Sequence, residues 1–213
     1  MTRPQIALVA HAALLIGALF FLVPTLTAWD LRAGFLFSLT AYWLFFCLPV
    51  IGWHALRHND GRLLSERLAW RNWFVPLLLF AQVFLVSLAT FVPNTAMLTS
   101  GGMWLAILIA LINGPLEELA WRGGFMSAFR DRPILGFWLG WLLFCAWHLP
   151  LGLSHGMIFE GGTLALVGGA AIMGLFWSWI AWRTGSVFYV ALAHMLTNVF
   201  AFWVLFDRNG FAS

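Results

Sequence analysis

The chain has 213 residues, of which 62% are hydrophobic and 9% are charged, and its net charge is +3. This composition excludes a water-soluble globular protein, because too few polar residues are present to cover a surface exposed to water. The basic residues do not cluster with exposed aromatic residues, which excludes nucleic-acid binding. We therefore predict a polytopic membrane protein whose partner is the lipid bilayer.

Seven apolar runs are long enough to cross a bilayer as helices, at about 1.5 Å of rise per residue. In chain order they cover residues 6–28, 33–53, 73–92, 103–121, 134–153, 163–182 and 187–206. The predicted fold class is thus all-α, a transmembrane bundle of about seven helices forming a single domain over residues 1–213. A lone histidine in a membrane helix, such as His11 in the first run, is expected to be a hydrogen-bond partner between helices.

The basic residues predict the orientation, because arginine and lysine in short loops stay on the cytoplasmic side. All eleven are arginine. With the N-terminus in the cytoplasm, only Arg32 and Arg208 lie outside, and the cytoplasmic ends contain Arg3, Arg57, Arg62, Arg67, Arg71, Arg122, Arg130, Arg132 and Arg183. The use of arginine at every basic position, together with the many tryptophans, also indicates a high-GC bacterium. We expect a multi-pass protein of the bacterial inner membrane.

Three short motifs place ionisable and amide side chains inside the late apolar runs. Such groups are costly at membrane depth, so they indicate a functional site there. The motifs are EELAWR from Glu117 to Arg122, FCAWH from Phe144 to His148, and HMLTN from His194 to Asn198. We place the catalytic site within the late helices, in a core of about residues 103–206.

Helical geometry assigns different tasks to the two adjacent glutamates. Successive side chains on a helix are about 100° apart, so Glu117 and Glu118 cannot both point at one substrate. Arg122 lies one turn from Glu118 and is predicted to hold it ionised in a charge-assisted pair. Glu117 shares its face with Asn113 and is left to face the other motif helices. Glu117 is therefore the candidate general base.

The depths of the motif residues are compatible with one site. If the fourth helix continues past Gly123 and Gly124 to about residue 130, Glu117 lies roughly 20 Å from its cytoplasmic end. With the fifth helix starting near residue 133 and the seventh near residue 185, His148 lies roughly 22 Å and His194 roughly 14 Å from the same side. His194 and Asn198 are four residues apart and share a face. Thr197, beside this face, is expected to line a polar cavity that admits water.

The three motifs, EExxxR, FxxxH and HxxxN in this order on successive helices, resemble those of the CPBP (Abi) family of intramembrane proteases, which includes the type II CAAX prenyl endopeptidases. The resemblance covers about residues 113–200, and the first three helices match only as hydrophobic spans. It implies endopeptidase cleavage of a membrane-associated protein or peptide. It also implies that water is activated by Glu117 and His148 with support from Glu118 and Arg122, and that the oxyanion is stabilised by His194 and Asn198.

A metal site is the alternative to this mechanism. Glu117, His148 and His194 would make a zinc site with one open position. We favour a metal-independent glutamate protease without a cofactor, because Asn198 and His194 form a natural pair of oxyanion donors. The sequence also lacks the HExxH pairing of two ligands on one helix.

Two functions of other classes remain open. A proton-coupled transporter would also line a cavity with Glu, His and Arg, although it would normally have two related halves with broken helices. A non-catalytic membrane scaffold or immunity factor could use the same fold to bind a partner.

Overall fold

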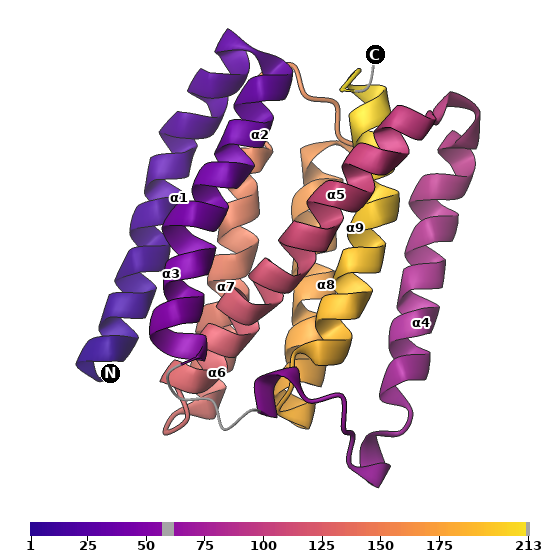
Figure 1. Cartoon of the computed structure of the whole chain (residues 1–213). Coiled ribbons are helices and arrows are strands. Elements are labelled where there is room, and N and C mark those ends of the chain that lie inside the picture. Colours follow the sequence, from indigo (N-terminus) through magenta and orange to yellow (C-terminus); the bar gives the residue numbers. More distant parts are fainter. Residues whose placement is uncertain (57–61, 212–213) are drawn as a thin grey trace.

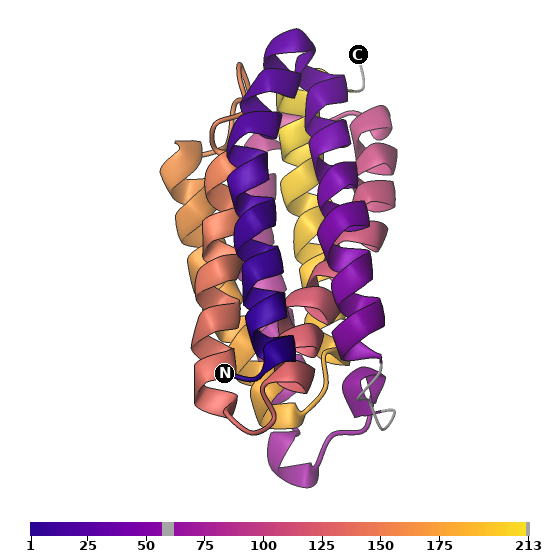
Figure 2. The same cartoon turned by 90° about the vertical axis from the view of Figure 1, so that its left-hand side faces the viewer.

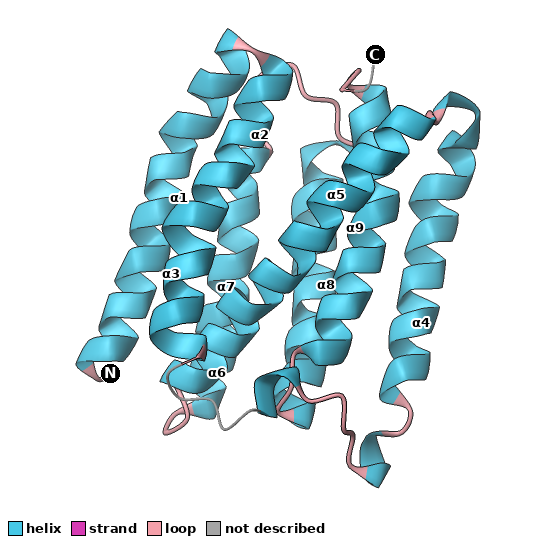
Figure 3. Ribbon diagram, in the orientation of Figure 1, coloured by secondary structure: helices cyan, strands magenta, loops and turns pink. Residues whose placement is uncertain are grey.

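The computed structural model describes residues 1–56 and 62–211 (Figure 1). The prediction that Arg57 lies at a cytoplasmic end concerns a residue outside this part of the chain. The described residues form helices, loops and turns and no strands, which confirms the all-α class (Figure 3). Within this described part of the chain, seven helical segments are long and apolar enough to span a membrane: Arg3–Trp29, Leu31–Ala55, Trp70–Met97, Ser100–Ala128, Pro133–Leu151, Gly162–Thr184 and Phe188–Arg208.

Four spans consist mainly of one α-helix, and three combine α-helix with π or 3-10 turns. The first span is α1 (Arg3–Trp29), and the last three are α7 (Pro133–Leu151), α8 (Gly162–Thr184) and α9 (Phe188–Arg208). The second span contains α2 (Leu31–Tyr42), η1 (Trp43–Cys47), α3 (Leu48–Val50) and η2 (Ile51–Ala55). The short turn η3 (Arg62–Leu64) precedes the third span. The third span contains η4 (Trp70–Asn72), α4 (Val75–Val86), η5 (Ser87–Phe91) and η6 (Val92–Met97). The fourth contains α5 (Ser100–Glu117), η7 (Glu118–Gly124) and α6 (Phe125–Ala128).

The helices form an elongated bundle in which α9 is central. In Figure 1, α1 and α2 lie at one edge, α4 lies at the other, and α5 crosses the bundle at an angle. α5 packs along α9, α1 along α2, and α7 along both α1 and α8, while α4 also contacts α9. Figure 2 shows α7 and α8 on one side of α1 and the second span on the other. The helices that carry the three motifs thus meet inside the bundle.

Polar side chains define where several spans begin. The Asp30 carboxylate accepts a hydrogen bond from the backbone N–H of Ala33 and caps α2. Thr99 caps α5 through the N–H of Gly102, and the Asp207 carboxylate at the end of α9 accepts hydrogen bonds from the backbone and hydroxyl of Thr99. The start of α5 is therefore anchored to the end of α9.

Close packing joins α5 to α9 along their length. A Cβ atom on Gly114 would lie 2.7 Å from the backbone nitrogen of Met195, so only glycine permits this approach.

On the opposite side of the bundle, a ring nitrogen of His11 on α1 lies 2.6 Å from the carbonyl oxygen of Phe45 in η1. This contact confirms the predicted role of His11 between helices.

Candidate active site

The first motif lies where α5 changes from α-helix to π-helix. α5 ends at Glu117, and the π-helix η7 begins at Glu118 and contains Arg122. Pro115 lies inside the last turn of α5, where its ring removes a backbone donor and disturbs the hydrogen-bond ladder. π-Turns within helices occur frequently at functional sites. The span continues past Gly123 and Gly124, as the sequence predicts, so both glutamates lie far from its ends.

Arg122 is buried and holds Glu118 in place. Its Nη1 lies 3.1 Å from Oε1 of Glu118, the pair predicted from their spacing. Its Nε donates to the hydroxyl of Ser178 and its Nη2 to the carbonyl oxygen of Gly174, both on α8. The guanidinium also lies 4.1 Å from the ring centre of Phe144 on α7. Partners on three helices thus stabilise one buried charge, since a cation over an aromatic ring is attracted by it.

His194 on α9 lies between the two glutamates. Its Nδ1 is 2.8 Å from Oε1 of Glu118, and its Nε2 is 3.4 Å from Oε2 of Glu117. The imidazole stacks on the ring of Trp177, with ring centres 4.2 Å apart. The adjacent glutamates thus reach opposite sides of one imidazole ring. The contact between Nε2 and Glu117 needs one shared proton, because a carboxylate and a bare ring nitrogen are both acceptors.

His148 on α7 is oriented by its own helix. Its Nδ1 lies 2.8 Å from the carbonyl oxygen of Phe144, so Nδ1 carries the proton and Nε2 of the neutral ring is an acceptor. The ring packs against Phe144 and Trp147, each with ring centres 4.7 Å apart. Among the described residues, no ion pair joins His148 to either glutamate. A bridging molecule would have to connect His148 to Glu117.

The motif residues that remain accessible line one cavity of about 370 Å³. Glu117, His148, His194 and Asn198 contribute to its wall, whereas Glu118 and Arg122 lie behind it. Thr197 also lines the cavity, as predicted. The volume falls within the range of small-ligand sites.

Four residues that line the cavity each have one buried polar atom without a hydrogen-bond partner among the described residues, and two of them are the predicted catalytic residues Glu117 and Asn198. Oε1 of Glu117 and Nδ2 of Asn198 are buried and make no hydrogen bond within the part of the chain that the structure describes. Buried polar groups are normally paired, so an unpaired one needs a reason. One of these atoms is an acceptor and the other a donor, and both belong to residues that line the same cavity.

A comparison with protein families agrees with this geometry. The model of the family described as "Type II CAAX prenyl endopeptidase Rce1-like" matches residues 98–200, slightly less than half of the chain. Residues 98–200 are thus similar to the Rce1-like family, and we call them the Rce1-like region. The match includes all three motifs, and it supports the predicted resemblance to the CPBP proteases. No curated protein and no solved structure gives a significant match.

Other residues of the Rce1-like region that support the site were missed in the sequence. α8 carries no motif, yet Gly174, Trp177 and Ser178 hold Arg122 and His194. A Cβ atom on Gly174 would lie 2.7 Å from the ring of Phe144. Glycine and serine four residues apart form a small-residue face on a membrane helix, and this pattern was the available signal.

The first three spans also contribute to the site. Nε1 of Trp43 donates to Oδ1 of Asn113, which lines the cavity one turn from Glu117. Gln82 on α4 donates to the hydroxyl of Thr197 and accepts from Nε1 of Trp177. Gln82, a polar residue inside an apolar span, was a visible signal that the sequence analysis did not use.

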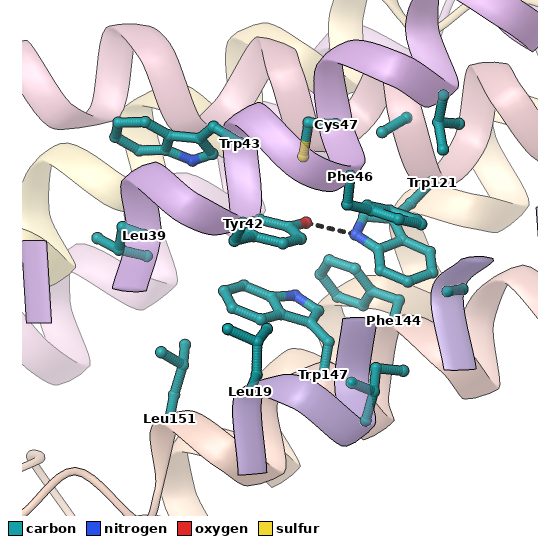
Figure 4. Packing of buried hydrophobic residues seen from close by; sticks show 14 of the residues in the cluster. Leu19, Leu39, Tyr42, Trp43, Phe46, Cys47, Trp121, Phe144, Trp147 and Leu151 are labelled. Carbon is teal, nitrogen blue, oxygen red and sulfur yellow. Dashed lines mark hydrogen bonds between the residues drawn. The ribbon is translucent and has the colours of Figure 1, made fainter. Parts of the chain in front are cut away.

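Aromatic rings from both regions pack beside the first motif (Figure 4). Nε1 of Trp121 donates to the hydroxyl of Tyr42 at 2.5 Å, and Tyr42 stacks on Trp147 with ring centres 3.9 Å apart. Phe46 packs on Trp121. This cluster holds Trp121 of η7 in place, because large rings in a close-packed interior leave little room to move.

Glu117, His148 and His194 are the alternative zinc ligands. The described residues contain no group of three His, Cys, Asp or Glu side chains arranged to hold a metal ion. A metal site at Glu117, His148 and His194 would require these side chains to rearrange.

Proposed function

We propose that the protein is an intramembrane endopeptidase that hydrolyses a peptide bond of a membrane-associated protein or peptide. Its Rce1-like region supports a membrane enzyme of the CAAX protease type. The observation that carries the proposal is that Glu117 and Asn198 line one cavity, and that Oε1 of Glu117 and Nδ2 of Asn198 have no hydrogen-bond partner among the described residues. Peptide hydrolysis needs a base for the attacking water and a donor for the carbonyl oxyanion.

In the proposed reaction, water lies between Glu117 and Nε2 of His148. Glu117 accepts a proton as the water oxygen attacks the carbonyl carbon. Asn198 and His194 donate hydrogen bonds to the developing oxyanion. When the C–N bond breaks, the proton held by Glu117 passes to the leaving amine, so a carboxylic acid and an amine are formed.

Glu118 and Arg122 act on this chemistry through His194. The Glu118 carboxylate is paired with Arg122 and accepts from Nδ1 of His194. This contact selects the orientation of the imidazole ring and keeps a proton on Nδ1. A donor at Nε2 therefore requires the doubly protonated ring, which the adjacent carboxylate stabilises. A carboxylate that fixes a histidine in this way occurs in many hydrolases.

Cleavage by the purified chain tests the proposal. A library of quenched fluorescent peptides with apolar sequences, presented in liposomes, is expected to contain substrates of the wild-type protein. His148→Ala is expected to abolish their cleavage and leave a folded protein. Absence of cleavage by the wild-type protein across the library would favour the non-catalytic scaffold. Activity that is lost to a chelator and restored by zinc would overturn the metal-independent mechanism.

We also propose that the N-terminus is cytoplasmic. Among the described residues, seven arginines lie at the ends of spans on that side in this orientation, including Arg67 in the loop before η4, and two lie at the other side. Two exposed positions at opposite ends of the bundle suit cysteine labelling: Glu66 and His155. In intact cells, an impermeant reagent is expected to label His155→Cys and not Glu66→Cys. The reverse pattern would refute this orientation.

A further inference from the structure

The cavity extends beyond the proposed catalytic residues to the C-terminal end of α9. One wall of the cavity there is a face of α9, because its lining residues recur every three or four positions: His194, Asn198, Ala201, Leu205 and Arg208. Asn198 and Arg208 are ten residues apart, which separates their Cα atoms by about 15 Å along the helix. The α9 side chains between Asn198 and Arg208 that line the cavity are apolar. The cavity therefore has polar groups at both ends and an apolar wall between them.

Arg208 has hydrogen-bonding capacity that the described residues do not use. Its Nη2 donates to Oδ1 of Asn94 at 2.6 Å and lies 2.5 Å from Oε2 of Glu160. Its Nε is buried and has no partner among the described residues. An unpaired buried donor is unfavourable, so an acceptor from a ligand would be stabilised there. The planar guanidinium fork matches a carboxylate.

A ligand carboxylate could displace Glu160 from Arg208. It also lines the cavity, and it is followed by Gly161 and Gly162, whose φ angles are +71° and +75°. The side chains of Arg208 and Glu160 are 30% and 44% exposed. Partly exposed ion pairs contribute little to stability, so a second carboxylate can replace Glu160 at low cost.

We propose that Arg208 binds the C-terminal carboxylate of the peptide substrate and that Glu160 occupies this guanidinium in the free protein. This inference rests on the proposed peptidase function. An extended peptide advances about 3.3 Å per residue, so about 15 Å corresponds to four or five residues. The cleaved bond would lie about that far from the C-terminus, and apolar residues in between would contact Phe202 and Leu205.

Peptide binding to an inactive variant tests the carboxylate site directly. A pool of apolar hexapeptides, synthesised both as free acids and as C-terminal amides, is incubated with Glu117→Gln protein in liposomes, and retained peptides are quantified by mass spectrometry. We expect the acids to be retained about tenfold more than the amides, as a charged hydrogen bond allows. Adding Arg208→Gln should remove this preference, and adding Glu160→Gln should increase it.

The matched control is Arg32→Gln. Arg32 is an exposed arginine at the same end of the bundle, its Nη1 donates to the carbonyl oxygen of Gly210, and it does not line the cavity. This variant should retain the preference for acids. If Arg208→Gln does not fold, Arg208→Lys takes its place, because lysine keeps the charge without the planar fork and should reduce the preference.

The outcomes separate this inference from the proposed function. Equal retention of acids and amides, an unchanged preference in the Arg208 variant, or no retention of either form would overturn the carboxylate site. Cleavage of acids and amides at equal rates by the wild-type protein would support the peptidase and refute the carboxylate site. Acid-selective binding without any cleavage would refute the peptidase and leave the carboxylate site standing.

Discussion

The Rce1-like region and the region before it contribute different kinds of side chain to the interior of one bundle. In the Rce1-like region, residues 98–200, charged side chains lie in the interior and are stabilised by partners from several helices. The region before it reaches the site with neutral groups, namely the indole of Trp43, the hydroxyl of Tyr42 and the amide of Gln82. A charge inside a membrane protein needs close partners, whereas aromatic rings pack without them. The comparison predicts that substitutions in the two regions will have effects of different kinds and sizes.

The largest effect is expected for Glu117→Gln, which keeps the shape of the side chain and removes the proposed base. General-base catalysis typically contributes a hundred- to ten-thousandfold, so cleavage should fall by up to about ten-thousandfold. Thermal unfolding should stay close to that of the wild type. Glu66→Gln, at an exposed position, is the control and should cleave normally. Normal turnover by Glu117→Gln would contradict its assignment as the base.

Arg122→Ala should lose stability as well as activity. The change leaves Glu118 buried beside His194 without its cation, and breaking a buried ion pair in this way costs about 3–5 kcal/mol. Denaturant unfolding in detergent micelles measures this loss. Arg130→Ala, an exposed position after the same span, should unfold like the wild type. If both variants are equally stable, the network around Arg122 has little structural role.

Asn198→Ala should fold normally and retain weak activity. The side chain lines the cavity and its Nδ2 has no described partner to lose, so the proposed oxyanion is the group affected. Removing one oxyanion donor typically lowers the rate about a hundred- to a thousandfold. The fall should appear in kcat rather than in KM, which steady-state kinetics separates. An effect confined to KM would instead assign Asn198 to substrate binding.

The smallest effect is expected outside the Rce1-like region, for Tyr42→Phe. The variant keeps the stacked ring and leaves Nε1 of Trp121 without its acceptor, at a cost of about 1–3 kcal/mol. Cleavage should change less than in the three variants above. Tyr189→Phe removes a hydroxyl whose bond to the Glu66 carbonyl is exposed, so it should be close to neutral. A catalytic loss in Tyr42→Phe as large as in Asn198→Ala would remove the proposed distinction between the regions.

The sequence by itself determined the number of spans and the contacts within single helices. Backbone groups have no water to bond in a bilayer, so a long apolar run must become a helix, and all seven runs did. The four-residue spacing of Glu118 and Arg122 was likewise sufficient to predict their contact. Residues one turn apart are neighbours on a helix, even where α-helix passes into π-helix.

Only the tertiary structure decided which side chains from different helices meet. His194 lies between Glu117 and Glu118 because α9 approaches α5 at Gly114, and no spacing within either helix contains that information. The same holds for Ser178 beside Arg122 and for Glu160 beside Arg208. Each contact depends on how helices pack, and small residues and aromatic rings spread over the whole chain set that packing.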